Sequence, residues 1–556
     1  MSRPRRVDTT STTSLLHSAG PSQTFRRESE WFSLSADPRA WGSNLSPNVT
    51  EADDELHNPI ARGGKSLDDE GFSFFSSRGM ANFGCLFVLC AGMLTMFVGY
   101  PILTYVREQN DSVASILGVN ASGQVPDIGN FGLIDVHTPD DAQTFTSWRD
   151  GKEWRLVFSD EFEEEGRTFY PGDDPYWEAV DLHYWETNNM EWYDPAAITT
   201  KNGSLVITLS AKETHGLDYQ GAIEHRNKFC FTGGYLVSSV QLPGINNVVG
   251  LWPAVWSMGN LGRAGYGATL DGMWPYTYDS CDVGTAPNQT TDGLPAIATT
   301  SGYEYSNYEL SYLPGQRLSR CTCSGESHPG PKHSDGTYVG RSAPEIDVFE
   351  AQISDGSGQV SQSGQWAPFN AGYVWDNSSD NLIIADTSIS TLNTYTGGST
   401  QQATSVVSET NQECYQLASG CFAIYGFESD DAYISWINDG KVAWTLNAAG
   451  MGADSATEIS ARPVPEEPMY IIANLGMSTN FGTVDLDHLT FPAIMMIDYI
   501  RVYQDPDNIN IGCDPDGFPT AKYIASYNEA YENPNLTTWV DDYGQTVPKN
   551  SLLDAC

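Results

Sequence analysis

Basic residues are scarce in this chain of 556 residues. It contains 28 Lys and Arg against 71 Asp and Glu, a formal net charge of −43. Residues 1–106 hold 9 of the basic and 11 of the acidic residues, which leaves 19 and 60 for the rest, a net charge of −41. Such an acidic surface repels a polyanion, so nucleic acid is excluded as a partner of the C-terminal part. The acidity suits either a soluble, self-repelling surface or a protein that handles a neutral polymer.

Long amphipathic helices are missing as well. Alternating runs such as residues 203–209 predict strands, and Gly, Asn and Pro turns separate them. The sequence therefore predicts an all-β sandwich of two sheets over residues 151–556. Residues 1–80, with Ser/Thr tracts and scattered prolines, predict a disordered cytosolic tail. That tail is either a plain tether or a carrier of sorting or phosphorylation signals.

Charge is absent altogether from residues 81–106. As a helix this segment is about 39 Å long, enough to cross a bilayer, and it lies too deep to be a cleavable signal peptide. Basic residues cluster between 62 and 78, whereas beyond Arg107 the next one is Arg149, so the N-terminus is expected in the cytosol. We expect a single-pass type II membrane protein of the secretory pathway (endoplasmic reticulum, Golgi or plasma membrane). Its stalk would cover residues 107–150, and its C-terminal domain would be lumenal or extracellular.

No cysteine precedes this span, two of the ten lie within it, and eight follow it. Those beyond the span are Cys230, Cys281, Cys321, Cys323, Cys414, Cys421, Cys513 and Cys556. An even lumenal set predicts disulfides, although Cys321 and Cys323 are too close to favour bonding each other. A metal site on that pair is disfavoured in an oxidising compartment, so neither a metal nor a cofactor is expected.

Glycosylation sequons also follow the span. The predicted acceptors are Asn110, Asn120, Asn202, Asn288, Asn377 and Asn535. Asn44 and Asn48 lie on the predicted cytosolic side and should stay unmodified.

Three carboxylates stand close together in the apolar, strand-forming residues 345–350. In a regular strand Glu345 and Asp347 share one face while Glu350 points away. A β-bulge at residues 348–349 would turn Glu350 to the face of the other two. In a chain this acidic, three acids at this spacing are expected about once by chance alone. The inference therefore depends on the apolar residues between them and on the surrounding motifs.

Two carboxyl groups roughly 5 Å apart across a glycosidic bond suit a retaining mechanism. Glu345 would attack the anomeric carbon as the nucleophile, and Glu350 would protonate the departing oxygen as the acid/base. Asp347 would hydrogen-bond the nucleophile and help to separate the two pKa values.

The carboxylate segment resembles the E-x-D-x-x-E signature of glycoside hydrolase family 16, the laminarinase-like jelly rolls. Segments that resemble the opening, cleft and closing strands of that family follow in order at residues 158–162, 250–256, 472–476 and 497–503. Residues 361–369 and 531–539 resemble the fungal β-1,6-glucan synthesis-associated branch. The resemblance covers roughly residues 150–556 and implies a concanavalin-like jelly roll that acts on β-glucan.

The resemblance also implies candidate sugar contacts. It places the strand with Trp252 and Trp256 along the glycan cleft, and positions four apart on a strand share a face. Most aromatic residues, which make up 12% of the chain, are expected to fill the core. Asn474, in a closing-strand motif, is a further candidate.

Two features depart from the simpler laminarinase pattern. A Cys-containing insertion over about residues 261–344 either walls the cleft, which favours transfer to sugar over transfer to water, or decorates the surface. No histidine occurs between His333 and His488, although such laminarinases usually carry one on the strand after the acids. The candidate sugar contacts in that region are instead Gln362, Gln365 and Trp366.

Three interpretations follow. The first is a membrane-anchored, retaining β-glucan-modifying enzyme, a glucanase or transglycosylase, in fungal cell-wall β-1,6-glucan biosynthesis. Its partners would be β-glucan and cell-wall synthesis proteins. The second is a β-1,3-glucan endohydrolase that uses the same acids but needs no sugar acceptor. The third is a non-catalytic glucan-binding assembly factor with vestigial carboxylates.

Overall fold

The computed structural model describes residues 60–61, 65–66, 90, 93–96, 132–225, 228–266, 271–538 and 540–556. The chain separates into two compact units, Met1–Thr104 and Tyr105–Cys556. In the described part of the first unit, β1 (Ile60–Ala61) pairs antiparallel with β2 (Lys65–Ser66). No helix among the described residues has the length and apolar character needed to cross a membrane. The predicted tail and span over residues 1–106 lie almost entirely outside the described residues, as do Asn110 and Asn120.

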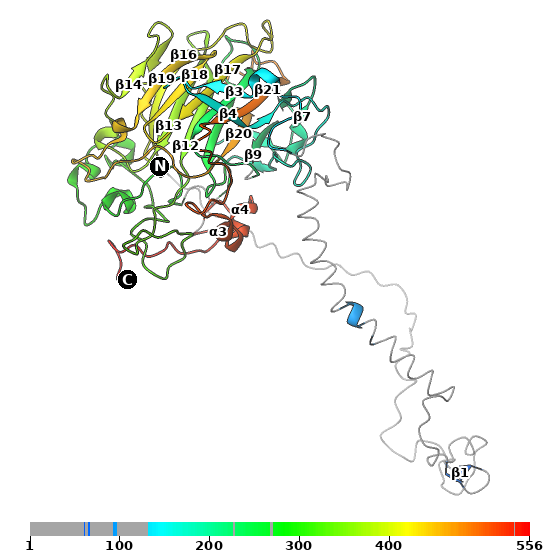
Figure 1. Cartoon of the computed structure of the whole chain (residues 1–556), viewed down its shortest axis with the longest axis vertical. Helices are drawn as coiled ribbons and strands as arrows, with labels where there is room; N and C mark the ends of the chain where they lie inside the picture. Colours follow the sequence, from blue (N-terminus) through cyan, green and yellow to red (C-terminus); the bar gives the residue numbers. More distant parts are fainter. Residues whose placement is uncertain are drawn as a thin grey trace, which may run out of the picture. The chain divides into compact units, whose positions relative to one another are not determined.

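The second unit contains two large sheets (Figure 1). In spatial order the first sheet consists of β14 (Leu382–Ile384), β19 (Lys441–Asn447), β18 (Tyr433–Asn438), β17 (Ala423–Ser429), β10 (Gly234–Gln241), β21 (Ala493–Gln504), β4 (Glu153–Asp160) and β3 (Thr144–Thr146), with β8 (Leu205–Leu209) and β7 (Ile198–Thr200) attached beside β21. The second consists of β15 (Ser390–Leu392), β16 (Gln402–Glu409), β13 (Ser357–Trp366), β12 (Glu345–Ser354), β11 (Trp252–Gly259), β20 (Met469–Gly476), β9 (Tyr219–His225), β6 (Glu191–Tyr193) and β5 (Leu182–His183). Neighbouring strands run antiparallel except β6 and β9.

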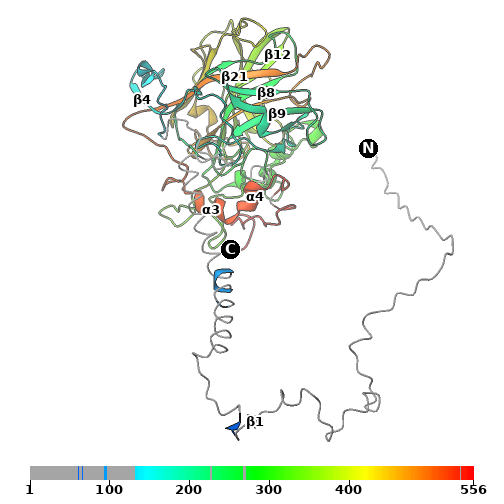
Figure 2. The ribbon, with the colours of Figure 1, turned by 90° about the vertical axis from the view of Figure 1, so that its right-hand side faces the viewer.

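Helical structure is sparse in the described part of the second unit. The α-helices there are α3 (Ala521–Ser526) and α4 (Asn528–Glu532). The 3₁₀ turns are η5 (Asp140–Ala142), η6 (Pro195–Ala197), η7 (Val283–Thr285), η8 (Pro287–Gln289), η9 (Ala296–Thr299), η10 (Glu304–Ser306), η11 (Ala371–Tyr373) and η12 (Ala448–Met451). In both Figure 1 and Figure 2, α3 and α4 lie together at one end of the sandwich.

The main hydrophobic core lies between the two sheets. Alternation along the strands builds it: on β10, Leu236 enters this core while Tyr235 and Val237 join a smaller cluster on the other face. The second sheet contributes Val255 and Phe349, among others, to the same core. The predicted all-β jelly-roll sandwich is confirmed, but it begins before residue 151, because β3 lies within the predicted stalk and pairs with β4.

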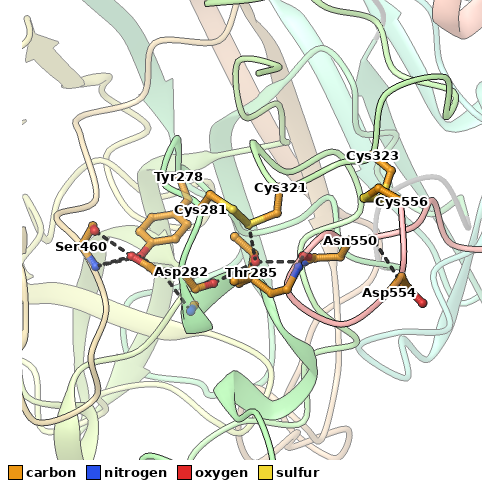
Figure 3. The surroundings of a disulfide bond; sticks show 12 residues. Tyr278, Cys281, Asp282, Thr285, Cys321, Cys323, Ser460, Asn550, Asp554 and Cys556 are labelled. Carbon is orange, nitrogen blue, oxygen red and sulfur yellow. Dashed lines mark hydrogen bonds between the residues drawn. A yellow bond between two sulfur atoms is a disulfide. The ribbon is translucent and has the colours of Figure 1, made fainter. Parts of the chain in front are cut away.

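All eight cysteines beyond residue 106 form disulfides, as predicted. The pairs are Cys230–Cys513, Cys281–Cys321, Cys323–Cys556 and Cys414–Cys421. Two of them tie the insertion to itself and to the C-terminus (Figure 3). Beside them the Asn550 amide donates to Thr285 Oγ1 at 3.0 Å, so the last residues of the chain pack against the insertion.

Candidate active site

A bulge in β12 determines where the carboxylates point. Asp347 pairs with Ser363 and Glu350 pairs with Ser361, so two residues of β12 oppose the single residue Gln362. The register with β11 shifts at the same place. The predicted β-bulge at residues 348–349 is therefore confirmed.

The bulge is held from inside the sandwich. The indole of Trp436 donates to the Asp347 carbonyl at 2.8 Å, and the Gln362 amide donates to the Val348 carbonyl, also at 2.8 Å. Val348 and Phe349 are both fully buried in the main core. Because both bulge residues point inward, the three carboxylates share the opposite face, here called the outer face.

Two candidate sugar contacts do not lie on the outer face. Trp366 is 1% exposed, belongs to the main core and donates to Thr404 Oγ1. Gln362 is 0% exposed and bonds the Val348 and Ile437 carbonyls. The prediction of sugar contacts at Gln362 and Trp366 is wrong, because alternation along β13 turns both into the interior while Gln365 faces outward.

Each carboxyl group has neutral hydrogen-bond donors. Trp274 Nε1 donates to Glu345 Oε2 at 2.7 Å, and Trp252 Nε1 donates to Glu350 Oε1 at 3.1 Å. Asp347 Oδ2 accepts bonds from Ser363 Oγ at 2.6 Å and from Gln365 Nε2 at 3.0 Å. Glu345 and Glu350 are half-buried, whereas Asp347 is buried, so the two glutamates are the ones that solvent or a ligand can reach.

The surroundings oppose ionisation of all three groups. Burial, reinforced by the negative charge of Asp347, raises the pKa of Glu350 to about 8, and the Trp252 indole opposes that rise. Burial and the charges of Asp347 and Glu350 raise the pKa of Glu345 well above its ordinary value, against the bond from Trp274. Burial also raises the pKa of Asp347, but Ser363 and Gln365 stabilise its charged form. Glu350 thus retains its proton at neutral pH, as a general acid requires.

The remaining candidates lie on β11 and β20. Trp252 is half-buried, and its ring stacks on Phe481 with centroids 4.2 Å apart. Phe481 lines a pocket of about 230 Å³ between the end of β12 and the start of β11. Trp256 and Asn474 are each 8% exposed and bond each other at 2.8 Å, so they form the floor beside the carboxylates.

The insertion packs directly on the outer face. Its residues Leu261 and Met273 join Trp256 and Met258 of β11 in a second hydrophobic cluster. Tyr531 of α4 belongs to the same cluster and donates to the Leu261 carbonyl at 2.9 Å. Together with the Trp274 bond, this packing makes the insertion a wall of the site, one of the two arrangements that the sequence left open.

Sequence reasoning missed three residues near the carboxylates. Trp274 lies in an aromatic run of the insertion, residues 273–278, which was the available signal for it. Phe481 carries no such signal. Burial raises the pKa of Glu186 to about 7, and both its carboxyl oxygens are buried without a hydrogen-bond partner in the described part of the chain. Burial, followed by the charges of Glu186 and Glu345, raises the pKa of Tyr184.

The geometry fits acid-assisted displacement at carbon. It offers a protonated carboxyl, a second carboxyl on the same face and a buried third one that can exchange a proton with its neighbour. Within the described ranges, no group of three or more His, Cys, Asp or Glu side chains is arranged to hold a metal ion.

Comparison with known proteins decides the family. The family model of beta-glucan synthesis-associated proteins SKN1/KRE6/Sbg1 matches residues 43–556. The chain belongs to this family. It is 42% identical over 524 residues to beta-glucan synthesis-associated protein KRE6 of Saccharomyces cerevisiae, covering 91% of this chain and 69% of that protein. It is 41% identical over 528 residues to protein SKN1 of Candida albicans, covering 92% of this chain and 67% of that protein.

Solved structures of lower similarity also match. The catalytic domain of an endo-1,3-beta-glucanase (laminarinase) from Thermotoga petrophila RKU-1 is 20% identical with a TM-score of 0.35, covering 64% of this chain and 98% of that one. An endo-beta-1,3-glucanase from Pyrococcus furiosus is 17% identical with a TM-score of 0.36, covering 65% of this chain and 98% of that one. Similarity at this level says nothing about activity.

Proposed function

We propose that the chain is a retaining β-glucan-modifying enzyme, a glucanase or transglycosylase, that acts in fungal cell-wall β-1,6-glucan assembly. The observation that carries this proposal is the β12 bulge, which gathers Glu345, Asp347 and Glu350 on the outer face. Buried carboxylates are costly, and three together with matched donors are best explained by chemistry. Family membership supplies the biological process.

The reaction would proceed in two displacements. Glu345 attacks the anomeric carbon of the donor glucan while its proton passes to Asp347, and Glu350 gives its proton to the departing glycosidic oxygen. A glucosyl ester of Glu345 results. In the second step Glu350 removes a proton from the incoming hydroxyl group, whose oxygen displaces Glu345 from the anomeric carbon, and Asp347 returns the proton to Glu345.

The incoming hydroxyl decides between hydrolysis and transfer. The insertion packs on the outer face, and its Trp274 donates a hydrogen bond to Glu345. A wall at this point limits the access of water and leaves room for a bound sugar acceptor, which favours transfer. A β-1,3-glucan endohydrolase would use the same three acids and would release soluble oligosaccharides instead.

One observation favours a non-catalytic function. Glu345 has a raised pKa, although a nucleophile must be ionised to attack. A glucan-binding assembly factor would tolerate three largely protonated carboxyls on its binding face. The enzyme proposal instead requires Asp347 to accept the proton of Glu345 when the donor sugar binds.

The proposed setting is the secretory pathway. The disulfides suit an oxidising compartment, and the family acts in β-glucan synthesis. The apolar residues 81–106 would anchor the chain with its C-terminal domain in the lumen or outside the cell.

Replacement of the acids in cells tests this proposal. A fungal strain that lacks its own copy would carry Glu345→Gln, Glu350→Gln or, as a control, Glu413→Gln, an exposed position away from β12. With equal expression and glycosylation, loss of alkali-insoluble β-1,6-glucan in the first two strains supports chemistry at these acids. Full rescue by both variants contradicts the enzyme and supports an assembly factor.

A further inference from the structure

Exposed tyrosines gather on one side of the carboxylates. Tyr303, Tyr305 and Tyr312 come from the insertion and Tyr395 follows β15; these four form what is here called the tyrosine patch. Their exposed fractions are 39%, 68%, 42% and 52%. Large aromatic rings that remain this exposed in one place mark a binding surface more often than a structural one.

The patch has a buried foundation. Tyr303 stacks on Tyr305 with ring centroids 5.3 Å apart, and it also stacks on Tyr373 with ring centroids 5.2 Å apart. Tyr373 is 2% exposed, and its hydroxyl donates to the Leu310 carbonyl. Burial, followed by the charges of all four patch tyrosines, raises the pKa of Tyr373.

Hydrogen bonds join the insertion to the loop after β15 at the tyrosine patch. The hydroxyl groups of Tyr303 and Thr396 lie 3.3 Å apart, and the Tyr312 amide donates to the Ser399 carbonyl at 2.6 Å. Gln401 Nε2 donates to the Tyr395 hydroxyl at 2.9 Å. The patch is therefore one fixed surface built from two distant segments.

A continuous line of contacts leads from the patch to the catalytic strand. Ser361 pairs with Glu350 across the ladder, and its hydroxyl lies 2.8 Å from that of Ser405. Asn393 Nδ2 donates to the same Ser405 hydroxyl at 3.2 Å, and Asn393 Oδ1 accepts the Tyr395 amide at 3.0 Å. The charge of Glu350 acts on the Tyr395 phenol. The patch thus lies on the side of Glu350 where β13 and β16 follow β12 in the sheet.

The chemistry of this surface selects a neutral ligand. Residues 387–408, which supply Tyr395 and its bonding partners, contain no Asp, Glu, Lys or Arg. Residues 303–312 of the insertion contain Glu304 and Glu309 but no Lys or Arg, so the surface repels an anionic ligand. Aromatic faces pack against the apolar C–H faces of pyranose rings, while hydroxyl and amide groups bond sugar hydroxyls. On the opposite flank of β12, the stacked pair of Trp252 and Phe481 offers a second aromatic surface.

We propose that the tyrosine patch is a glucan-binding subsite that extends the carboxylate site across β13 and β16 and holds a neutral β-linked glucan chain. The proposal rests on the proposed function, because it assumes that β-glucan is the ligand of the outer face. A chain bound there and on Trp252 would cross β12 over Glu345 and Glu350. The patch therefore supplies one half of the binding path.

Binding measurements on the full-length protein test the patch. All variants carry Glu345→Gln so that the probe is not consumed, and the probes are a β-1,3-linked and a β-1,6-linked glucohexaose in titration calorimetry. Tyr305→Ala and Tyr395→Ala should each weaken the binding of at least one hexaose about two- to tenfold, the range for one aromatic contact. Tyr305→Phe and Tyr395→Phe keep the ring and should retain most of the affinity. Tyr170→Ala, at a tyrosine that is 41% exposed, is the control and should change nothing.

A second readout does not depend on the folding of the tyrosine variants. In the Glu345→Gln parent, nitration by tetranitromethane should modify Tyr305 and Tyr395, and either bound hexaose should protect both while Tyr170 stays reactive. Unchanged affinity in both Ala variants, or nitration unaffected by bound hexaose, overturns the subsite. If the parent binds neither hexaose, the proposed function fails together with the subsite, whereas binding without protection refutes the subsite alone.

Discussion

The side-chain amide of Gln362 donates a hydrogen bond to the backbone carbonyl of Val348, at 2.8 Å, from within the core of the sandwich. The same amide reaches the Ile437 carbonyl of β18 at 3.0 Å, so one side chain connects the bulge to the opposite sheet. A residue that no glucan can touch thereby helps to turn Glu350 outward.

Gln362→Met should weaken the support of the carboxylate site from the core side of the sheet. Methionine has a similar volume but no donor, so two buried carbonyl groups lose a partner, at a cost of about 1–3 kcal/mol in the free energy of unfolding. Denaturant titration measures this loss, and initial rates on β-glucan should fall because Glu350 is held less firmly. Gln359→Met, on the half-buried end of β13, is the matched control. Equal stability and equal rates in both variants would show that Gln362 does not support the bulge.

The two indoles should control opposite limbs of the pH profile. Glu350 acts while protonated, so activity should fall as the pH rises through its pKa of about 8. Trp252→Phe deletes a bond that lowers this pKa and should move the alkaline limb to higher pH. Glu345 must release its proton to Asp347 to attack, and Trp274→Phe deletes a bond that lowers the pKa of Glu345, so the acid limb should also move to higher pH.

These shifts are measured as kcat/KM against pH, with Trp148→Phe, at an exposed tryptophan, as the control. Changes in rate without any shift of either limb would show that the indoles do not act on the carboxyl groups.

Glu350→Gln should stabilise the protein in a pH-dependent way. The folded state raises the pKa of Glu350 from 4.5 to about 8, so it binds the proton more tightly than the unfolded chain does. The contribution of Glu350 to stability is therefore complete below about pH 4.5 and is lost as the pH rises through 8. The melting temperature of Glu350→Gln should exceed that of the wild type by about 2 °C or more at pH 8. The difference should vanish near pH 4. A constant difference at every pH would argue against a protonated Glu350.

Glycosylation tests the topology. Asn202, Asn377 and Asn535 are exposed, so each should carry a glycan if the second unit is lumenal. Substitution of each by Gln should increase gel mobility by one glycan, and endoglycosidase should abolish the difference. Asn44→Gln and Asn48→Gln should change nothing. A glycan at Asn44 would contradict the predicted orientation, because it would place the N-terminal tail in the lumen.

The sequence was informative where the pattern was local. Glu345, Asp347 and Glu350 lie within one strand, so alternation alone required a bulge to unite them, and the bulge is present. The same alternation could not assign faces on β13, because the register between two strands depends on pairing. Gln362 and Trp366 were proposed as sugar contacts together with Gln365, although alternation puts them on the opposite face from it, and only the pairing with β12 shows which face is the outer one.

Long-range contacts were beyond pattern reasoning. Trp274 reaches Glu345 from 71 positions earlier in the chain, and the tyrosine patch joins the insertion to the loop after β15. Only the disulfides and the packing of the insertion on the outer face create these neighbours. The composition of the insertion indicated aromatic surface but could not indicate where it lies.

Trapping of the covalent intermediate tests the central claim most directly. A 2-deoxy-2-fluoro laminaribiosyl donor with a good leaving group slows the second displacement, so the glucosyl ester accumulates and peptide mass spectrometry locates it. The account predicts a label on Glu345, lost in Glu345→Gln and much slower to form in Asp347→Asn. If the protein binds β-glucan but no label forms on Glu345, the carboxylates do not perform this chemistry.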